Sequence, residues 1–293
     1  MEKRLKKAAI TVAVVAGILI LAAVLLGVLN ALVGKGEWVL GWNDYRYDES
    51  GYEIGEGSIP SESVTRIELD WIDGEVEIVS CQDTFISISE SADCILPESA
   101  IVRWKIADDG TLSIKYRKSA WFFALGSGNR QKKLTLRVPE RFFDQLTAID
   151  VDVDSTDVVV YDIVAPSFSF ESSSGTLGVK DCVFASVSVD TKSGDVVTEG
   201  LTSNCVSIES MSGNVDMRAV LSPDQMQIDT ESGDIKLRFP QDASFVLDWE
   251  SKSGRISYDL PLTQADGKYI LGGGNHLFEI RTESGDLSLI TNK

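Results

Sequence analysis

Apolar and polar residues alternate along this chain in a motif that returns at a nearly fixed interval. In the copy at residues 187–198, V-S-V-D-T-K-S-G-D-V-V-T, two alternating apolar positions lead into an acid, a hydroxyl residue and a Ser-Gly-Asp turn, and alternation then resumes. Because side chains two residues apart share one face of a β-strand, each copy predicts a strand, a turn and a second strand. The copies centre on Gly175, Gly194, Gly213, Gly233, Gly254 and Gly285, with degenerate copies at Gly74 and Thr156.

The interval between copies predicts the architecture. From Thr156 onward the centres are separated by 19, 19, 19, 20, 21 and 31 residues. A fixed period indicates a stacked array, and about 19 residues is too short for a propeller blade, which needs about 40. We therefore predict an all-β fold, a β-solenoid of about 19–20-residue repeats, stacked in sequence order with about 4.8 Å between coils. The turn glycines are predicted to be structural, because glycine reaches positive φ at little cost.

The motif also assigns side chains to the inside or the outside of the coil. Val187 and Val189 are predicted to point inward, and the hydroxyl residue three places before the glycine, such as Thr191, continues that face. The residue before it is usually acidic, as at Asp190, and is predicted to point into solvent.

An apolar segment precedes the repeats. Ala8–Val33 contains 26 residues without a charge, which is enough for a membrane-spanning helix of about 20 residues. The basic residues before it predict a cytoplasmic N-terminus and an extracellular remainder. A cleaved signal peptide is the alternative, but its apolar region is usually about 7–15 residues, so we favour an uncleaved anchor in the cell membrane. The predicted parts are a basic N-terminus with transmembrane anchor (1–34), a juxtamembrane stalk (35–63), an N-terminal β-region with the degenerate first repeat (64–147) and the β-solenoid repeats (148–293).

Charge and composition argue against several functions. The formal net charge of −18 repels nucleic acid, and no basic patch with interleaved aromatic residues is present in the sequence. Neither zinc-ligand spacing nor a nucleophile motif occurs, and the single histidine, His276, lies in a glycine-rich stretch, so we predict no enzyme, cofactor or metal site. Four cysteines allow three connectivities, and buried free thiols are equally compatible with the sequence. They are Cys81, Cys94, Cys182 and Cys205.

Three sets of residues leave alternatives open. A column of Asp195, Asn214, Asp234 and Asp286 follows the turn glycines; stacked acids can bind Ca²⁺, but a ladder of turn residues is the interpretation we favour.

The crowded apolar stretch Trp121, Phe122, Phe123 and Leu125 breaks the alternation, and it predicts either a partner-contact loop or a hydrophobic plug over an open solenoid end. We favour the plug. A third set belongs either to a membrane-interface belt or to a first strand, and it contains Trp38, Trp42, Tyr45 and Tyr47.

The recurring pattern [ILV]-x-[ILV]-[DE]-[ST]-x-S-G-[DN]-[ILV], with K-K-L-T-L-R-V-P at 132–139, resembles an adhesin-like β-strand-repeat family, a domain of unknown function. The resemblance covers roughly residues 64–293 and implies a solenoid-like β-fold in the cell envelope of Gram-positive bacteria, often behind one membrane helix. It supplies no catalytic residues. The leading hypothesis is therefore a membrane-anchored binding or scaffold module that contacts a protein or an envelope polymer. An accessory of envelope-stress sensing is the alternative, and a glycan-active β-helix enzyme is a distant one.

Overall fold

The structure is a computed structural model that describes residues 42–123 and 132–292. The predicted anchor Ala8–Val33 lies outside these residues, and within them no helix is both long and apolar enough to cross a membrane. The described residues divide into two units, the first with residues 42–47 and 119–123, and the second with residues 48–118 and 132–292. Each unit is described separately below.

In the first unit, two short strands form an antiparallel ribbon. β1 (Trp42–Tyr45) pairs with β8 (Ala120–Phe123), so that Trp42 lies opposite Phe123 and Tyr45 opposite Ala120. The backbone of Trp121, Phe122 and Phe123 is thus a strand, whereas Leu125 lies outside the described residues. The choice between a plug and a contact loop stays a prediction.

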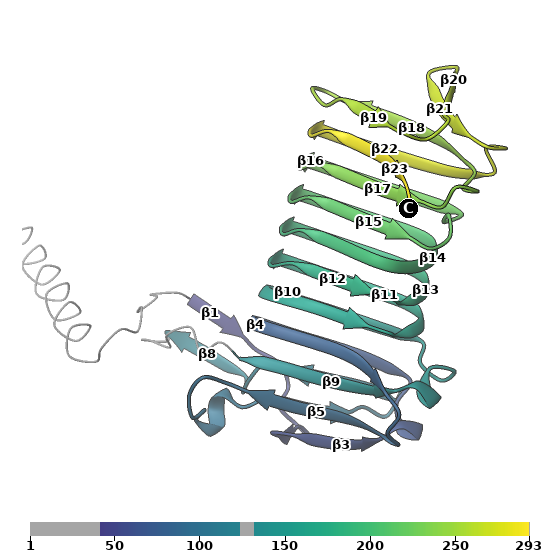
Figure 1. Ribbon diagram of the computed structural model, residues 1–293. Coiled ribbons are helices and arrows are strands. Elements are labelled where there is room, and N and C mark those ends of the chain that lie inside the picture. The colour runs from purple at the N-terminus through teal and green to yellow at the C-terminus, as the bar shows by residue number, and fades with distance from the viewer. Residues whose placement is uncertain (1–41, 124–131, 293) are drawn as a thin grey trace, which may run out of the picture. The chain divides into compact units, whose positions relative to one another are not determined.

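The second unit is a parallel β-solenoid in which each coil adds one strand segment to each of two facing sheets (Figure 1). We name each coil after its central residue. The first sheet is formed before the turn by β11 (Val164–Ser174), β13 (Val183–Ser193), β16 (Gln225–Ser232), β18 (Phe245–Ser251) and β22 (His276–Ser284). The second is formed after the turn by β12 (Leu177–Lys180), β15 (Val215–Ala219), β17 (Ile235–Phe239), β19 (Ile256–Tyr258) and β23 (Leu287–Thr291). β4 (Arg66–Cys81), β10 (Ala148–Tyr161) and β14 (Val196–Ser212) contribute to both.

The predicted stacking in sequence order is wrong at the C-terminal end. β22 pairs with β16 on one side and with β18 on the other, and β23 lies likewise between β17 and β19. The Gly285 coil therefore lies between the Gly233 coil and the Gly254 coil, which ends the stack. The long interval between the last two repeats explains this order, because its hairpin β20 (Thr263–Ala265) and β21 (Lys268–Leu271) returns the chain and pairs antiparallel with β18.

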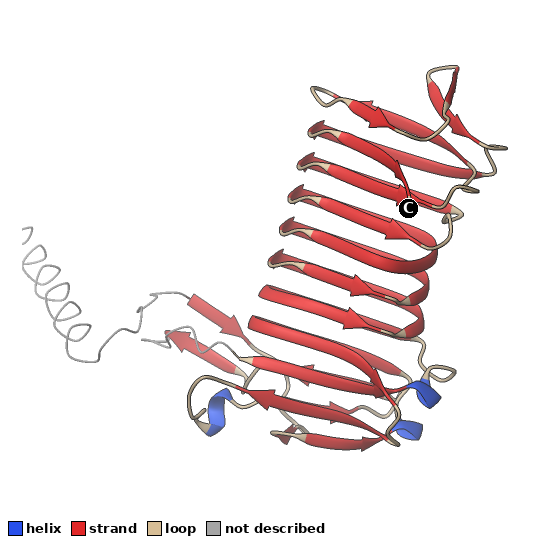
Figure 2. Cartoon of the chain, viewed as in Figure 1, coloured by secondary structure: helices blue, strands red, loops and turns tan. Residues whose placement is uncertain are grey.

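The same inversion occurs at the other end. β7 (Thr111–Lys115) and β9 (Lys133–Pro139) together form an outer coil, and β4 lies between them and β10. Antiparallel strands then close both sheets. The first sheet is closed by β6 (Arg103–Ile106) and β2 (Glu53–Ile54). The second sheet is closed by β5 (Phe85–Ser91) and β3 (Gly57–Pro60). Residues 48–63, predicted as part of a stalk, thus contribute β2, β3 and the 3₁₀ turn Ser61–Ser63 to this cap (Figure 2).

A buried lysine takes the place of the turn glycine in the outer coil. The carbonyl of Lys132 accepts the Glu75 N–H at 2.9 Å, and its side chain is only 1% exposed. Its Nζ lies 2.5 Å from Glu90 Oε1 and donates to the carbonyls of Ala100 and Tyr116 at 2.7 and 2.5 Å. This ammonium also lies 3.9 Å from the ring centroid of Tyr116. The outer coil thus contains a buried ammonium that is paired with a carboxylate and two backbone carbonyls.

The inward pattern predicted from the sequence is confirmed. Val187 and Val189 are 5% and 3% exposed, while Asp190 reaches solvent. The inward positions that stay less covered, Trp249, Ile256 and Tyr258, all belong to the Gly254 coil. Their exposure follows from the position at the end of the stack, because β19 is paired on one side only and β21 pairs with β18 only from Phe245 to Leu247.

The turn glycines form a column with no room for a side chain. A Cβ on Gly213 would lie 2.0 Å from the carbonyl oxygen of Gly194, and the same close approach recurs between Gly233 and Gly213. Gly213 also has φ +153. Glycine is thus required here by close backbone contact between coils, in addition to the positive φ expected from the sequence. Thr156 lies in the same column: β10 continues as one strand through this corner, as β4 does at Gly74, and a Cβ on Gly175 would lie 2.1 Å from the Thr156 carbonyl oxygen.

Candidate binding groove

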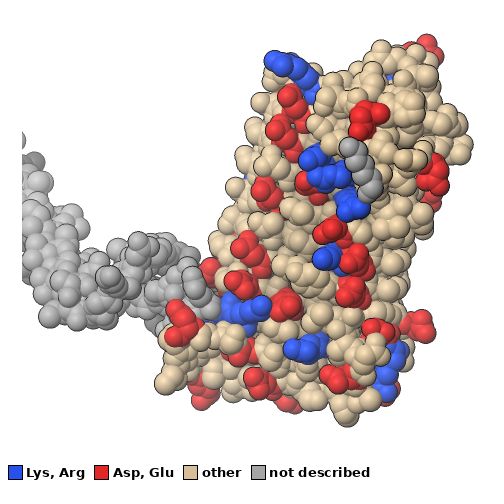
Figure 3. All heavy atoms as spheres, in the orientation of Figure 1, with Lys and Arg blue, Asp and Glu red and all other residues tan. Residues whose placement is uncertain are grey.

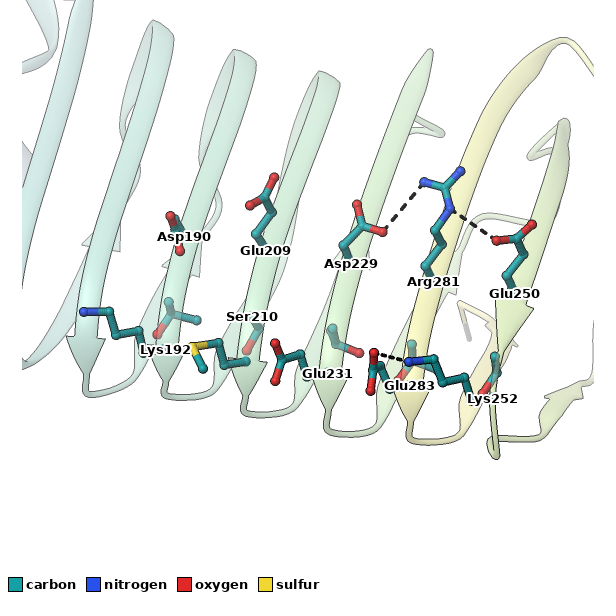
Figure 4. A pocket seen from close by; sticks show the side chains of 15 residues that line it. Asp190, Lys192, Glu209, Ser210, Asp229, Glu231, Glu250, Lys252, Arg281 and Glu283 are labelled. Atoms are coloured by element: carbon teal, nitrogen blue, oxygen red, sulfur yellow. Dashed lines mark hydrogen bonds and ion pairs between the residues drawn. The ribbon is translucent and has the colours of Figure 1, made fainter.

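A groove runs along the outside of the first sheet, next to the turns (Figure 4). Its volume is 670 Å³, and it crosses the coils from Gly194 to the end of the stack. The row farther from the turns contains Asp190, Glu209, Asp229, Arg281 and Glu250, and the row nearer the turns contains Lys192, Met211, Glu231, Glu283 and Lys252. Met211 adds an apolar surface, because its side chain is 50% exposed.

The register of the sheet explains the position of this groove. From the Gly194 coil to the Gly285 coil the ladder pairs the hydroxyl residues and then skips one residue before the turn, as between β13 and β14, where Thr191 pairs with Ser210 and Ser193 with Ser212. The skipped residues, Lys192 and Met211, form the row nearer the turns. Because the repeat is regular, equivalent side chains of successive coils line up and form the two rows of the groove.

The farther row continues beyond the groove as a ladder of acids. In spatial order it contains Lys115, Asp70, Asp152, Glu171, Asp190, Glu209, Asp229, Arg281 and Glu250. Facing residues of paired strands are about 4.8 Å apart, and like charges in that position are destabilising. The column therefore concentrates negative charge along the length of the stack.

The charges at the two ends of this ladder are neutralised, while those in the middle are not. Lys115 Nζ lies 2.9 Å from Asp70, and Arg281 lies 3.7 Å from Asp229 and 3.5 Å from Glu250. Among the described residues, no ion pair involves Glu171, Asp190 or Glu209. Elsewhere charges are paired, as between Arg238 and Asp216 or Arg218 and Glu199, and Figure 3 shows a face on which both signs are interspersed. The middle of the ladder is thus an unusual concentration of one sign.

The pKa of one carboxyl records this crowding. Partial burial raises the pKa of Asp152 above its usual value, and the carboxylates of Asp70 and Glu171 raise it further. The folded state is therefore destabilised when Asp152 is charged. This destabilisation is absent at a pH below the carboxyl pKa of the unfolded chain, and it is fully present at a pH above the raised pKa of the folded state.

We expect Asp152→Asn to raise the melting temperature at pH 7 and to leave it unchanged near pH 3, where the wild-type carboxyl is protonated. Thermal melts across this range measure the effect. Asp109→Asn is the matched control, because hydrogen bonds from Thr111 lower the pKa of Asp109, so its loss should lower stability at pH 7. A destabilised Asp152→Asn protein at pH 7 would contradict the acid ladder.

The column after the turn glycines is a hydrogen-bond ladder between coils. Asp195 Oδ1 accepts the backbone N–H of Asn214 at 2.8 Å, and Asn214 Oδ1 accepts that of Asp234 at 3.0 Å. Asp234 and Asp286 continue the ladder, to the N–H groups of Asp286 and Arg255 at 2.9 Å each. These oxygens bond the neighbouring turn, as the turn interpretation predicts. No group of three or more His, Cys, Asp or Glu side chains within residues 42–123 and 132–292 is arranged to hold a metal ion.

The other chemical candidates have structural surroundings. All four cysteines are free thiols, and burial raises the pKa of Cys182 to about 11, so it stays protonated at neutral pH. His276 Nδ1 lies 3.2 Å from Asp224 Oδ1 at the start of β22. Neither residue lines the groove. The groove residues themselves were not singled out from the sequence as a site, although the acid that recurs four places before most of the turn glycines was the visible signal.

Fold and groove thus define an all-β solenoid whose candidate site is a surface built from repeated positions. The family model described as “Toastrack DUF4097” matches residues 64–290, and the chain belongs to this Toastrack family. A search of curated proteins gives no match.

Solved structures that resemble the chain are distant in sequence. A “putative cell adhesion protein” from Clostridium sporogenes is 10% identical, with 82% of this chain and 100% of that chain covered and a TM-score of 0.40. A “putative adhesin” from Bacteroides fragilis is 12% identical, with 82% of this chain and 97% of that chain covered and a TM-score of 0.43. A “putative lipid binding protein” from Parabacteroides distasonis is 9% identical, with 83% of this chain and 98% of that chain covered and a TM-score of 0.41.

Proposed function

We propose that this protein is a binding module of the cell envelope and that the groove beside the turns is its binding site. The observation that carries the proposal is the set of in-register carboxylates without a cationic partner, of which Asp190 and Glu209 line the groove. Their mutual repulsion costs stability, and a positively charged ligand would remove that cost on binding.

The partner that fits this groove is an extended cationic segment of another protein. The groove follows the axis of the solenoid, so a chain lying in it meets a new carboxylate at each coil from the Gly194 coil to the Gly233 coil, about every 4.8 Å. Met211 offers contact for the aliphatic part of a lysine or arginine side chain. Toward the Gly254 coil, Arg281 and Lys252 are paired with acids and reduce the attraction, which limits the cationic segment to the other end of the groove.

A fluorescent peptide of alternating lysine and serine tests the site by anisotropy, with a glutamate–serine peptide as the probe of opposite charge. Replacing both Asp190→Asn and Glu209→Gln should weaken binding of the lysine peptide about tenfold, which corresponds to about 1.4 kcal/mol. High salt should weaken it as well, because the contacts are exposed.

The matched control removes two charges outside the groove, through Glu56→Gln and Asp266→Asn, both at exposed positions. This variant should bind the lysine peptide almost as well as the wild type. An equal loss in both double variants would mean that only the overall charge attracts the peptide. No measurable binding to the wild type at low salt would refute the cationic partner.

The proposal places the module outside the cell, held by Ala8–Val33 as an uncleaved membrane helix. The apolar length of this segment and the basic residues before it support that orientation. We expect a protease added to intact cells to remove the region after residue 36 and to leave a short membrane-bound fragment. If the full-length chain survives on intact cells but is digested after lysis, the orientation is wrong.

A further inference from the structure

The coil that comes last in the sequence is not the last coil of the stack, and both of its edges are paired. β22 is hydrogen-bonded to β16 and β18, and β23 to β17 and β19. All four of these neighbouring strands precede β22 in the chain. Without residues 276–291 the remaining chain would contain an open position, which we call the slot, with one unpaired strand edge on each side in both sheets.

An aromatic cluster holds this coil in the slot. The ring of Phe278 stacks on Phe245 at a centroid distance of 4.5 Å and on Phe239 at 5.4 Å. Each of the three side chains is 0% exposed. Phe239 and Phe245 belong to the walls of the slot, whereas Phe278 belongs to the coil that fills it. The slot is therefore specific for a strand that presents this aromatic residue in this register.

A glycine-rich connection leads into the coil. Between β21 and β22 the chain runs through Gly272, Gly273, Gly274 and Asn275, and Gly272 and Gly274 have φ of +59 and +67. Glycine also reaches extended conformations freely, so this connection can open without strain. An element that is paired on both sides and joined through such a hinge satisfies the structural requirement for exchange between identical chains.

We propose that β22 and β23 form an exchangeable coil, and that two copies of this chain place their coils in each other's slots. Every contact of the coil is the same in the exchanged dimer as in the monomer, so concentration decides between the two forms. Removal of the coil from a folded chain requires separation from strands on both sides. Exchange therefore takes place during folding, when the slot is open, and the dimer then persists after dilution. The partner here is a second copy of the chain, so the inference is independent of the cationic ligand.

A disulfide across the edge of the slot tests this. Gln227 of β16 faces Glu279 of β22, and both side chains lie on the outer side of the sheet. Facing residues about 4.8 Å apart are within the Cα distance that a disulfide spans. The full chain would carry Gln227→Cys and Glu279→Cys, with Cys81, Cys94 and Cys205 replaced by Ser. It would be unfolded, refolded in detergent at two protein concentrations tenfold apart, oxidised and separated on a denaturing, non-reducing gel.

At the lower concentration we expect the disulfide within one chain. At the higher concentration we expect a covalent dimer that is at least severalfold more abundant and that does not decrease when the folded sample is diluted before oxidation. The matched control is Ser207→Cys with Gln227→Cys, which face each other between β14 and β16. Neither residue belongs to the exchanged coil, so this pair should stay within one chain at both concentrations.

Glu279→Cys alone measures collisions between surface thiols. Covalent dimer at the same level in this single variant or in the control pair would overturn the proposal. The proposal would also be overturned if the Gln227→Cys, Glu279→Cys protein formed no covalent dimer at either concentration. A non-covalent dimer whose disulfides all remain within single chains would show ordinary surface association, and would also refute the exchange.

Discussion

Gly213→Ala should destabilise the solenoid by about 2–5 kcal/mol, the combined range for a strained φ and for backbone overlap that forces neighbours apart. The added Cβ would lie 2.0 Å from the carbonyl oxygen of Gly194, in a backbone conformation with φ +153. The two coils would have to separate at the turn, which disturbs the hydrogen-bond ladder on both sides of it. Thermal melts should show a decrease of roughly 5–15 °C.

Gly178→Ala is the control for this variant. Gly178 lies within β12, and its Cβ would meet Val159 Cγ1 at 3.4 Å, an ordinary contact. Because glycine weakens a strand interior, this change should be neutral or slightly stabilising. If both variants melt alike, the glycine column is not held by close backbone contact, and the turn glycines are interchangeable with other residues.

Lys132→Met should cost about 3–5 kcal/mol, since it leaves the buried Glu90 carboxylate without its cation. The carbonyls of Ala100 and Tyr116 would lose their donor as well. Methionine fills a similar volume, so the loss reports the charge and hydrogen bonds more than packing. The melting temperature should fall by roughly 10 °C.

The neighbouring lysine provides the control. Lys133 lies 3.1 Å from Glu77, but its side chain is 43% exposed, and a surface pair of this kind contributes at most about 1 kcal/mol. Lys133→Met should therefore have a small effect. In addition, Glu90→Gln combined with Lys132→Met should recover part of the stability, because the uncompensated charge is then gone. A Lys132→Met protein as stable as Lys133→Met would show that the buried pair contributes little.

The local pattern predicted each coil well, because alternation with a period of two leaves little freedom over which face is buried. Val189 and Asp190 lie on the sides that the motif assigned to them. The order of the coils was not predictable in the same way. Every repeat presents the same edges, so the Gly285 coil pairs equally well with several partners, and only the long hairpin before it decides between them. Lys132 was also missed, since it occupies a turn position that no repeat motif marks.

The groove could not be predicted from the sequence for a different reason. The recurrence of an acid at Asp190 and its equivalents indicated a wet outer face, yet a row of acids is common on solvated strands. The site depends on two further facts that need coordinates: that Arg281 and Lys115 fall at the ends of the ladder, and that the skipped residue forms a second row. The inverted coil order moves Arg281 next to Asp229, and the sequence gives no sign of it.

The position of β4 has a mechanical consequence. This strand is the first long element after the N-terminal segment, and it lies inside the stack, with β10 on one side and β7 and β9 on the other. Within the second unit, a pull from the N-terminal side first detaches β2 and β3, which are edge strands of two and four residues. It then reaches a strand of sixteen residues that is paired on both sides. The evenly spaced hydrogen bonds of these parallel pairs resist sliding of the strand together instead of opening one at a time. A tether at this end would therefore yield by a short, defined length and then hold.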